Sequence, residues 1–150
     1  MKNEQCGPHK AYIFGMDANT LAALSYWAQL IFALVPGLKN VAFIAPILIY
    51  FIENQSSFVK FHAMQCLFLN LFVWAATYLI LFLGGGASFA PAMANPLAAL
   101  MSLPLTVALL YVAILALWIA RIVATIKAAQ YKEYHIFLIG EWAATAARTN

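Results

Sequence analysis

Two long apolar stretches decide the fold: residues 66–83 read CLFLNLFVWAATYLILFL, and residues 103–120 read LPLTVALLYVAILALWIA. Neither contains a charged residue, and at about 1.5 Å per helical residue each approaches the about 30 Å thickness of a hydrocarbon core. The whole chain has 150 residues, 65% hydrophobic and 9% charged, whereas a soluble domain has about 25% charged residues. This composition excludes a freely soluble enzyme and predicts an all-α, polytopic integral membrane helix bundle.

Working outward from these stretches, the chain divides into four hydrophobic segments, a short first hairpin followed by two longer spans. The predicted segments cover about 20–35, 38–53, 57–83 and 98–129. The first two are too short to cross a bilayer comfortably, so they form either tilted spans or a re-entrant hairpin. Residues 1–18 form an N-terminal arm, and residues 135–150 are expected to lie at the membrane interface.

The distribution of basic residues predicts the topology. With four segments, both termini lie on one side, and only Lys39 falls on the opposite side. The other seven basic residues are Lys2, Lys10, Lys60, Arg121, Lys127, Lys132 and Arg148. The positive-inside rule then places both termini in the cytoplasm or its organellar equivalent. A dense basic run is absent from the sequence, so nucleic acid is not an expected partner.

Four polar residues, His62, Gln65, Cys66 and Asn70, form a stripe along the third segment. Their spacing of three and four residues places them on one helix face, where hydrogen bonds to other helices are the expected role. His62 and Cys66 are also possible metal ligands, but a closed zinc site needs about four. As a nucleophile and base, the pair lacks an evident orienting group. We therefore expect no metal, no cofactor and no catalytic residue.

Charged residues mark the inner boundary of the predicted bundle: Glu53, Lys60, Arg121 and Lys127. Arg121 follows the second apolar stretch directly. The sequence leaves open whether it extends to the interface, pairs with Glu53 or contacts a substrate, because a lone arginine within the bilayer costs about 2.5–3.5 kcal/mol.

Small residues recur every four positions on the last segment, at Ala116, Ala120, Ala124 and Ala128. This spacing allows another helix to approach closely. The neighbour is either a helix of the same bundle or a partner subunit.

Three motifs resemble the Tic20-like (DUF4870) family of small membrane proteins. They are Phe58 to Gln65 (FVKFHAMQ), Ile126 to Ala129 (IKAA) followed by Tyr131 and Glu133-Tyr134, and Asn19 to Tyr26 (NTLAALSY). The resemblance covers residues 19–134, although the glycine and proline of the family's last motif are absent. It implies a four-helix bundle without known catalytic activity, whose relatives include a chloroplast protein-import component and magnetosome-membrane proteins.

These observations favour a non-enzymatic accessory or assembly subunit of a larger membrane complex. Its expected partners are membrane lipid and either other integral membrane subunits or further copies of itself. The alternative is a pore or protein-translocation element formed by oligomerisation, with His62, Gln65, Asn70, Thr77 and Arg121 facing a shared lumen. A third hypothesis is an intramembrane enzyme or metal protein centred on His62 and Cys66.

Overall fold

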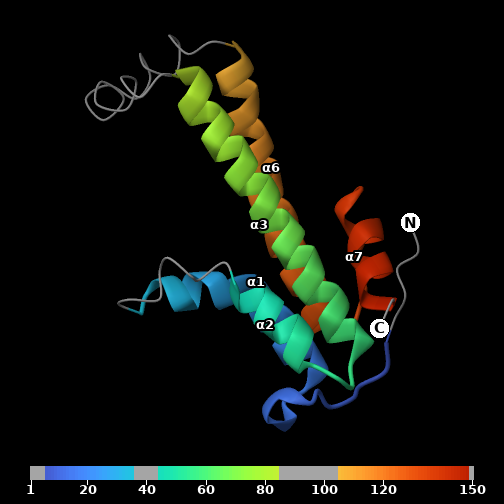
Figure 1. The fold of residues 1–150 in the computed structure, drawn as a ribbon. Coiled ribbons are helices and arrows are strands. Elements are labelled where there is room, and N and C mark those ends of the chain that lie inside the picture. The colour runs from blue at the N-terminus through green and yellow to red at the C-terminus, as the bar shows by residue number, and fades with distance from the viewer. Residues whose placement is uncertain (1–5, 36–43, 85–104, 149–150) are drawn as a thin grey trace. The chain divides into compact units, whose positions relative to one another are not determined.

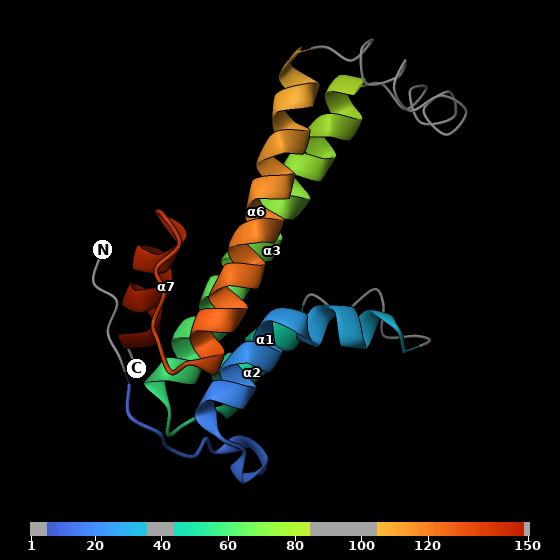
Figure 2. The ribbon, with the colours of Figure 1, turned by 180° about the vertical axis from the view of Figure 1, so that it is seen from behind.

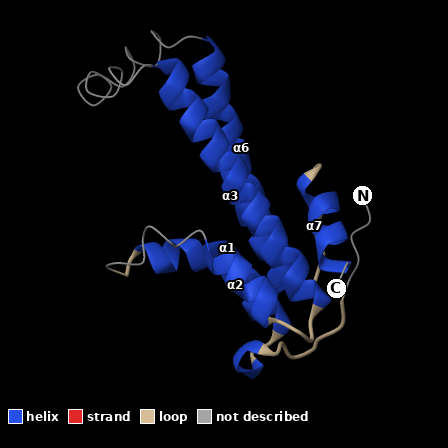
Figure 3. Cartoon of the chain, viewed as in Figure 1, coloured by secondary structure: helices blue, strands red, loops and turns tan. Residues whose placement is uncertain are grey.

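The computed structural model describes residues 6–35, 44–84 and 105–148, which form helices joined by turns and loops (Figure 1, Figure 3). In chain order the elements are η1 (Ile13–Gly15), α1 (Ala18–Ala33), α2 (Ala45–Ile52), α3 (Ser57–Gly84), α6 (Leu105–Ala129) and α7 (Ile139–Arg148). This mainly helical structure confirms the predicted all-α class. Residues 38–43 and 98–104, which the sequence assigns to the second and fourth segments, lie outside the described residues.

Two of the described helices are long and apolar enough to cross a membrane: α3 over Ser57–Phe82 and α6 over Val107–Ala129. The helices α1 and α2 pack against each other but have only 16 and 8 residues. At about 1.5 Å per residue, α2 is about 12 Å long and is too short to span a bilayer. Within the described residues the structure therefore contains two candidate membrane spans, and the predicted four-segment bundle is not confirmed.

Capping groups explain where α3 begins. The Ser56 hydroxyl accepts a hydrogen bond from the Val59 amide at 3.2 Å, the usual role of a serine before the first helical turn. The preceding helix, α2, has Pro46 in its first turn, where a missing amide hydrogen is tolerated.

The C-terminal end of α6 is closed by Tyr131, which has a left-handed backbone conformation with φ 58°. The Tyr131 amide donates to the Ala128 carbonyl and the Lys132 amide to the Lys127 carbonyl, both at 3.0 Å, as in a Schellman motif. Glycine is the usual residue at this position, and a tyrosine there costs about 1–2 kcal/mol. Stacking of the Tyr131 ring on Phe58, with centroids 6.0 Å apart, stabilises the unusual conformation.

The chain forms two compact units. Unit 1 comprises the described residues up to Asn70 and from Ala120 onward. Its core contains the fully buried side chains of Tyr26, Phe58 and Phe61. Unit 2 comprises the described residues between Leu71 and Ile119, which are the second half of α3 and the first part of α6.

The C-terminal tail, predicted from the sequence as an interfacial segment, contains helix α7 within unit 1. Its alanine face, with Ala143, Ala144 and Ala147, is buried in a cluster with Phe61 of α3. Close packing also surrounds Gly140, because a Cβ atom there would lie 2.6 Å from the His135 Cα. The tail is thus an integral part of the unit 1 core.

Candidate functional site

Seven polar side chains from α1, α3 and α6 are buried together in unit 1, each 4% exposed or less. They are Ser25, Tyr26, His62, Gln65, Cys66, Asn70 and Arg121. The four residues of the predicted polar stripe are all among them. Because a buried polar group without a partner is strongly destabilising, their hydrogen bonds indicate what the cluster does.

Arg121 lies inside this cluster rather than at an exposed boundary. Its guanidinium donates hydrogen bonds to the Tyr26 backbone carbonyl at 3.3 Å and to the Asn70 side-chain oxygen. The sequence suggested Glu53 as its partner, but the Glu53 carboxylate binds backbone amides elsewhere in unit 1. Arg121 therefore links α6 to both α1 and α3.

His62 and Cys66, four residues apart on α3, bind different groups. The Tyr26 hydroxyl and His62 Nδ1 share a hydrogen bond of 2.9 Å. The Cys66 thiol donates to the Ser25 carbonyl at 3.3 Å, while Asn70 Nδ2 donates to Cys66 Sγ at 3.8 Å. This arrangement is not that of a thiol activated by an adjacent imidazole.

Gln65 extends the cluster toward the segment after α6, because its Nε2 donates to the Tyr134 carbonyl at 3.0 Å. The aromatic rings of Phe58 and Phe61 lie 4.6 and 5.0 Å from the His62 ring and close the cluster on that side. Within the described ranges, no group of three or more His, Cys, Asp or Glu residues is placed to share a metal ion.

Glu53 forms a second buried polar site, which the sequence did not indicate. Its fully buried carboxylate accepts hydrogen bonds from four backbone amides. The Tyr12 amide lies 3.0 and 2.9 Å from its two oxygens, and the Ile13 amide lies 3.3 Å from Oε2. The amides of Gln55 and Ser56 bind Oε1 at 2.9 and 3.0 Å. The carboxylate therefore joins the N-terminal arm to the turn between α2 and α3.

Burial alone would raise the pKa of the Glu53 carboxyl, but the hydrogen bonds from these four amides outweigh burial and leave its pKa below the usual value. Glu53 is consequently held as a carboxylate. A glutamate at the end of a predicted segment gives no sequence signal for this role, because its donors come from the backbone.

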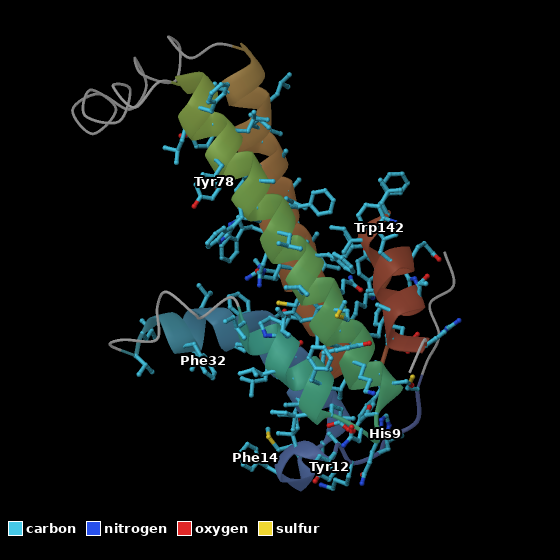
Figure 4. All side chains as sticks on the ribbon, viewed as in Figure 1. His9, Tyr12, Phe14, Phe32, Tyr78 and Trp142 are labelled. Atoms are coloured by element: carbon cyan, nitrogen blue, oxygen red, sulfur yellow. The ribbon has the colours of Figure 1, made fainter. Side chains whose placement is uncertain are left out.

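The N-terminal arm makes further contacts with unit 1. His9 Nε2 lies 2.7 Å from the Ser56 hydroxyl, and the Cys6 amide donates to the Tyr131 carbonyl at 2.9 Å. In Figure 4, the labels of His9 and Tyr12 mark the same end of unit 1. The arm is thus attached both to the start of α3 and to the end of α6, and Figure 2 shows this arrangement from behind.

The remaining predicted boundary charges, Lys60 and Lys127, are not among the buried residues of the polar cluster. Lys60 is half-buried, with its ammonium 5.7 Å from the centre of the Tyr50 ring, a cation–π contact. Lys127 lies in the last turn of α6, where a cation interacts favourably with the helix dipole. The surroundings of both lysines therefore differ from those of the buried Glu53 and Arg121.

The predicted alanine stripe is divided by burial. Ala124 and Ala128 are completely buried in unit 1, and Ala120 is half-buried. Ala116, which belongs to unit 2, is exposed. Ala124 and Ala128 therefore pack inside unit 1.

A family model described as the magnetosome magnetite crystal formation protein family, MamF/MmsF, matches residues 17–143. No curated protein and no solved structure matches the chain. The identification as a Tic20-like (DUF4870) protein is therefore wrong. Two of the motifs that suggested it lie at the first turns of α3 and the last turn of α6, where they supply buried aromatic and helix-end residues of unit 1. Such packing requirements do not identify one family.

Proposed function

The chain belongs to the magnetosome magnetite crystal formation protein family, and from this premise we propose that it is a non-enzymatic accessory or assembly subunit in the magnetosome membrane. In this role it packs beside other integral membrane proteins that act in magnetite crystal formation. It supplies a binding surface and a stable scaffold, while the chemistry of mineral formation takes place elsewhere.

The observation that carries this proposal is the apolar surface of unit 2. Among its described side chains only Ile80 and Val107 are buried, whereas large apolar side chains all around both helices are exposed. The exposed set includes Leu71, Phe72, Trp74, Tyr78, Phe82, Leu109, Val112 and Leu115. Such a surface requires lipid or other membrane helices around it.

The polar cluster supports a scaffold role better than a pore or an enzyme. A pore would need His62, Asn70 and Arg121 on a hydrated lumen, but these side chains are buried and hydrogen-bonded within unit 1. An enzyme centred on His62 and Cys66 would need the two to act together, and they bind separate partners. The hydrogen bonds of the cluster join α1, α3 and α6, and this supports a structural role.

We further propose that both termini lie on the cytoplasmic side, with α1 and α2 as a hairpin that returns to the side from which it enters. Two observations support this topology. The Cys6 amide binds the Tyr131 carbonyl, so the arm and the end of α6 lie together. All charged residues of the described ranges belong to unit 1, and unit 2 has none.

The proposal can be tested in magnetite-forming cells that lack this chain. We expect crystals of altered size or shape by electron microscopy, restored by the unaltered protein. A tagged chain, extracted with its native lipids into nanodiscs, should give a heteromeric complex in native mass spectrometry. Normal crystals in the deletion strain, or recovery of the chain only as monomer or homo-oligomer, would contradict the proposal.

A matched pair of variants tests whether unit 2 carries the partner surface. Leu115→Trp enlarges a side chain that is 61% exposed on α6, and it should reduce recovery of the partner. Phe32→Trp, at an exposed position of α1 in unit 1, serves as the control. Equal recovery of the partner with both variants would remove unit 2 from the proposed interface.

A further inference from the structure

Residues 131–148 fold back along the first half of α3 as a hairpin. On its first arm, the Tyr134 carbonyl accepts a hydrogen bond from Gln65, and the His135 ring lies 4.9 Å from the Phe61 ring. Its second arm is α7, where the Trp142 ring lies 5.9 Å from the Phe68 ring. Phe61 and Phe68 are two helical turns apart, so the arms extend about 10 Å along α3.

The bend of this hairpin, at Phe137 and Leu138, presents large apolar side chains outward. Phe137 is 78% exposed and Leu138 56% exposed, and the neighbouring Trp142, labelled in Figure 4, is 50% exposed. Leu138 has φ 62°, a left-handed conformation that costs a branched L-residue about 1–2 kcal/mol. A strained backbone that holds an apolar side chain outward indicates that this side chain has a role outside the unit.

Three carbonyl groups at the bend are paired within the hairpin. The Ile139 amide donates to the Phe137 carbonyl at 2.8 Å, the Gly140 amide to the Ile136 carbonyl at 2.7 Å, and the Trp142 amide to the Leu138 carbonyl at 3.4 Å. Backbone groups that are already paired can enter the region of acyl chains without the loss of hydrogen bonds to water.

The bend also lies beside a membrane span. Phe68, which contacts Trp142, belongs to the part of α3 that is long and apolar enough to cross a bilayer. The medium that surrounds α3 at this level therefore also surrounds the bend. Basic residues lie at the open end of the hairpin, at Lys132 and Arg148, and Arg148 is about 9 Å from Trp142 along α7.

From this arrangement we infer that the Phe137–Leu138 bend, with Trp142, inserts into the bilayer at the boundary between headgroups and acyl chains, while Lys132 and Arg148 face anionic headgroups. The distance of about 9 Å matches the about 5–10 Å depth to which interfacial apolar faces are buried. Glu141 sets an upper limit on the depth, because its side chain is 75% exposed and its carboxylate, 3.4 Å from His135 Nδ1, requires the polar boundary. This lipid-binding surface is independent of the proposed accessory role.

Spin labelling of the full chain tests the inference in nanodiscs of phosphatidylcholine and phosphatidylglycerol. The label is placed at Phe137→Cys or, as the control, at Gln130→Cys, an exposed position after the end of α6. Both variants carry Cys6→Ser, and the remaining Cys66 is fully buried and does not label in the folded chain. Power saturation then compares relaxation by oxygen, which concentrates in lipid, with relaxation by a water-soluble nickel chelate.

We expect oxygen to relax the label at position 137 more strongly than nickel does, and the reverse order at position 130. A label at 137 with the nickel preference of the control would place the bend in water and overturn the inference. A label shielded from both reagents would also overturn it, because another protein surface, such as a second copy, would then cover the bend.

A second measurement leaves the bend intact. Bromine atoms on the upper acyl chain should quench Trp142 fluorescence more than bromine atoms near the chain end. Trp142→Phe should therefore remove the quenching component with this shallow-depth preference. An unchanged quenching profile in Trp142→Phe would contradict the inference.

Discussion

Replacement of Glu53 by glutamine should release the N-terminal arm. The amide oxygen can still accept the hydrogen bonds of Gln55 and Ser56, which bind Oε1. The Tyr12 amide, which also lies 3.0 Å from Oε1, can stay bound to that oxygen. The amide nitrogen, however, would face the Ile13 N–H group, which binds Oε2 at 3.3 Å. The variant therefore loses the charge on every remaining hydrogen bond and leaves one buried donor without an acceptor.

A hydrogen bond to a charged group is worth about 1.5–3 kcal/mol and one between neutral groups about 0.5–1.5 kcal/mol, while a buried donor without a partner costs about 1–3 kcal/mol. For Glu53→Gln the weaker Tyr12 bond costs about 1 kcal/mol and the unpaired Ile13 amide about 1–3 kcal/mol, which together give a loss of about 2–4 kcal/mol in the stability of the attached arm. Since about 1.4 kcal/mol corresponds to a tenfold change, the protection of the Tyr12 and Ile13 amides from hydrogen exchange should fall about 30- to 700-fold.

Hydrogen exchange in nanodiscs, corrected for intrinsic rates, measures this change, and trypsin cleavage after Lys10 should accelerate in parallel. Glu141→Gln, at a glutamate whose side chain is 75% exposed, is the control and should leave the arm unchanged. Equal protection of Tyr12 and Ile13 in Glu53→Gln and the unaltered protein at pH 7 would refute the role assigned to the carboxylate.

The same interaction has a defined pH dependence. The pKa of Glu53 is lower in the folded protein than in the unfolded chain, so the unfolded chain binds the proton more readily. The stabilisation is therefore complete above the ordinary glutamate pKa of about 4.3 and is lost as the pH falls through the lower folded-state pKa. The unaltered protein should approach Glu53→Gln in acid, and greater protection of its arm in acid than at pH 7 would contradict this account.

Two further substitutions test the packing of unit 1. Gly140→Ala should destabilise α7 by about 1–3 kcal/mol, because its Cβ would lie 2.6 Å from the His135 backbone; hydrogen exchange of α7 measures this, and Gly7→Ala, which has open space, should have no such effect. Asn70→Leu should lower stability by about 2–3 kcal/mol, because Arg121 loses a buried acceptor. Thermal unfolding of Asn70→Leu, Arg121→Met and the double variant should show a smaller loss in the double variant than the sum of the single losses, and simple additivity would mean that the two side chains are not coupled.

The sequence supports prediction of those features that depend on neighbouring residues. The apolar run after Cys66 is long enough to predict a membrane helix, and Ser56 and Ser57 mark the start of α3 because a hydroxyl can cap the next turn. The i and i+4 spacing of His62 and Cys66 places them on one face. Spacing alone, however, does not reveal that Tyr26 of another helix binds one and Ser25 the other.

Features that depend on distant backbone groups could not be predicted. The backbone amide of Tyr12 binds a carboxylate 41 positions later in the chain. Every residue except proline has such an N–H group, so the sequence does not show which one will bind. For Arg121 the sequence likewise left pairing with Glu53 open on charge alone, although a buried guanidinium is also satisfied by neutral oxygens such as the Asn70 amide. The α7 helix escaped prediction as a core element because alanine packs well without a strongly apolar pattern.

The composition of unit 1 from both ends of the chain has a consequence for the order of events during synthesis. A ribosome delivers the N-terminal half of this unit first. Arg121 can donate its hydrogen bonds to Tyr26 and Asn70 only after residues 71–119 have been made, and the Cys6 amide can bind the Tyr131 carbonyl only after that as well. A nascent chain that stops before Ala120 therefore exposes half of a polar cluster without its cation. Because residues 71–119 are translated between the two parts of unit 1, the residues from Ala120 onward complete a unit that the residues up to Asn70 begin.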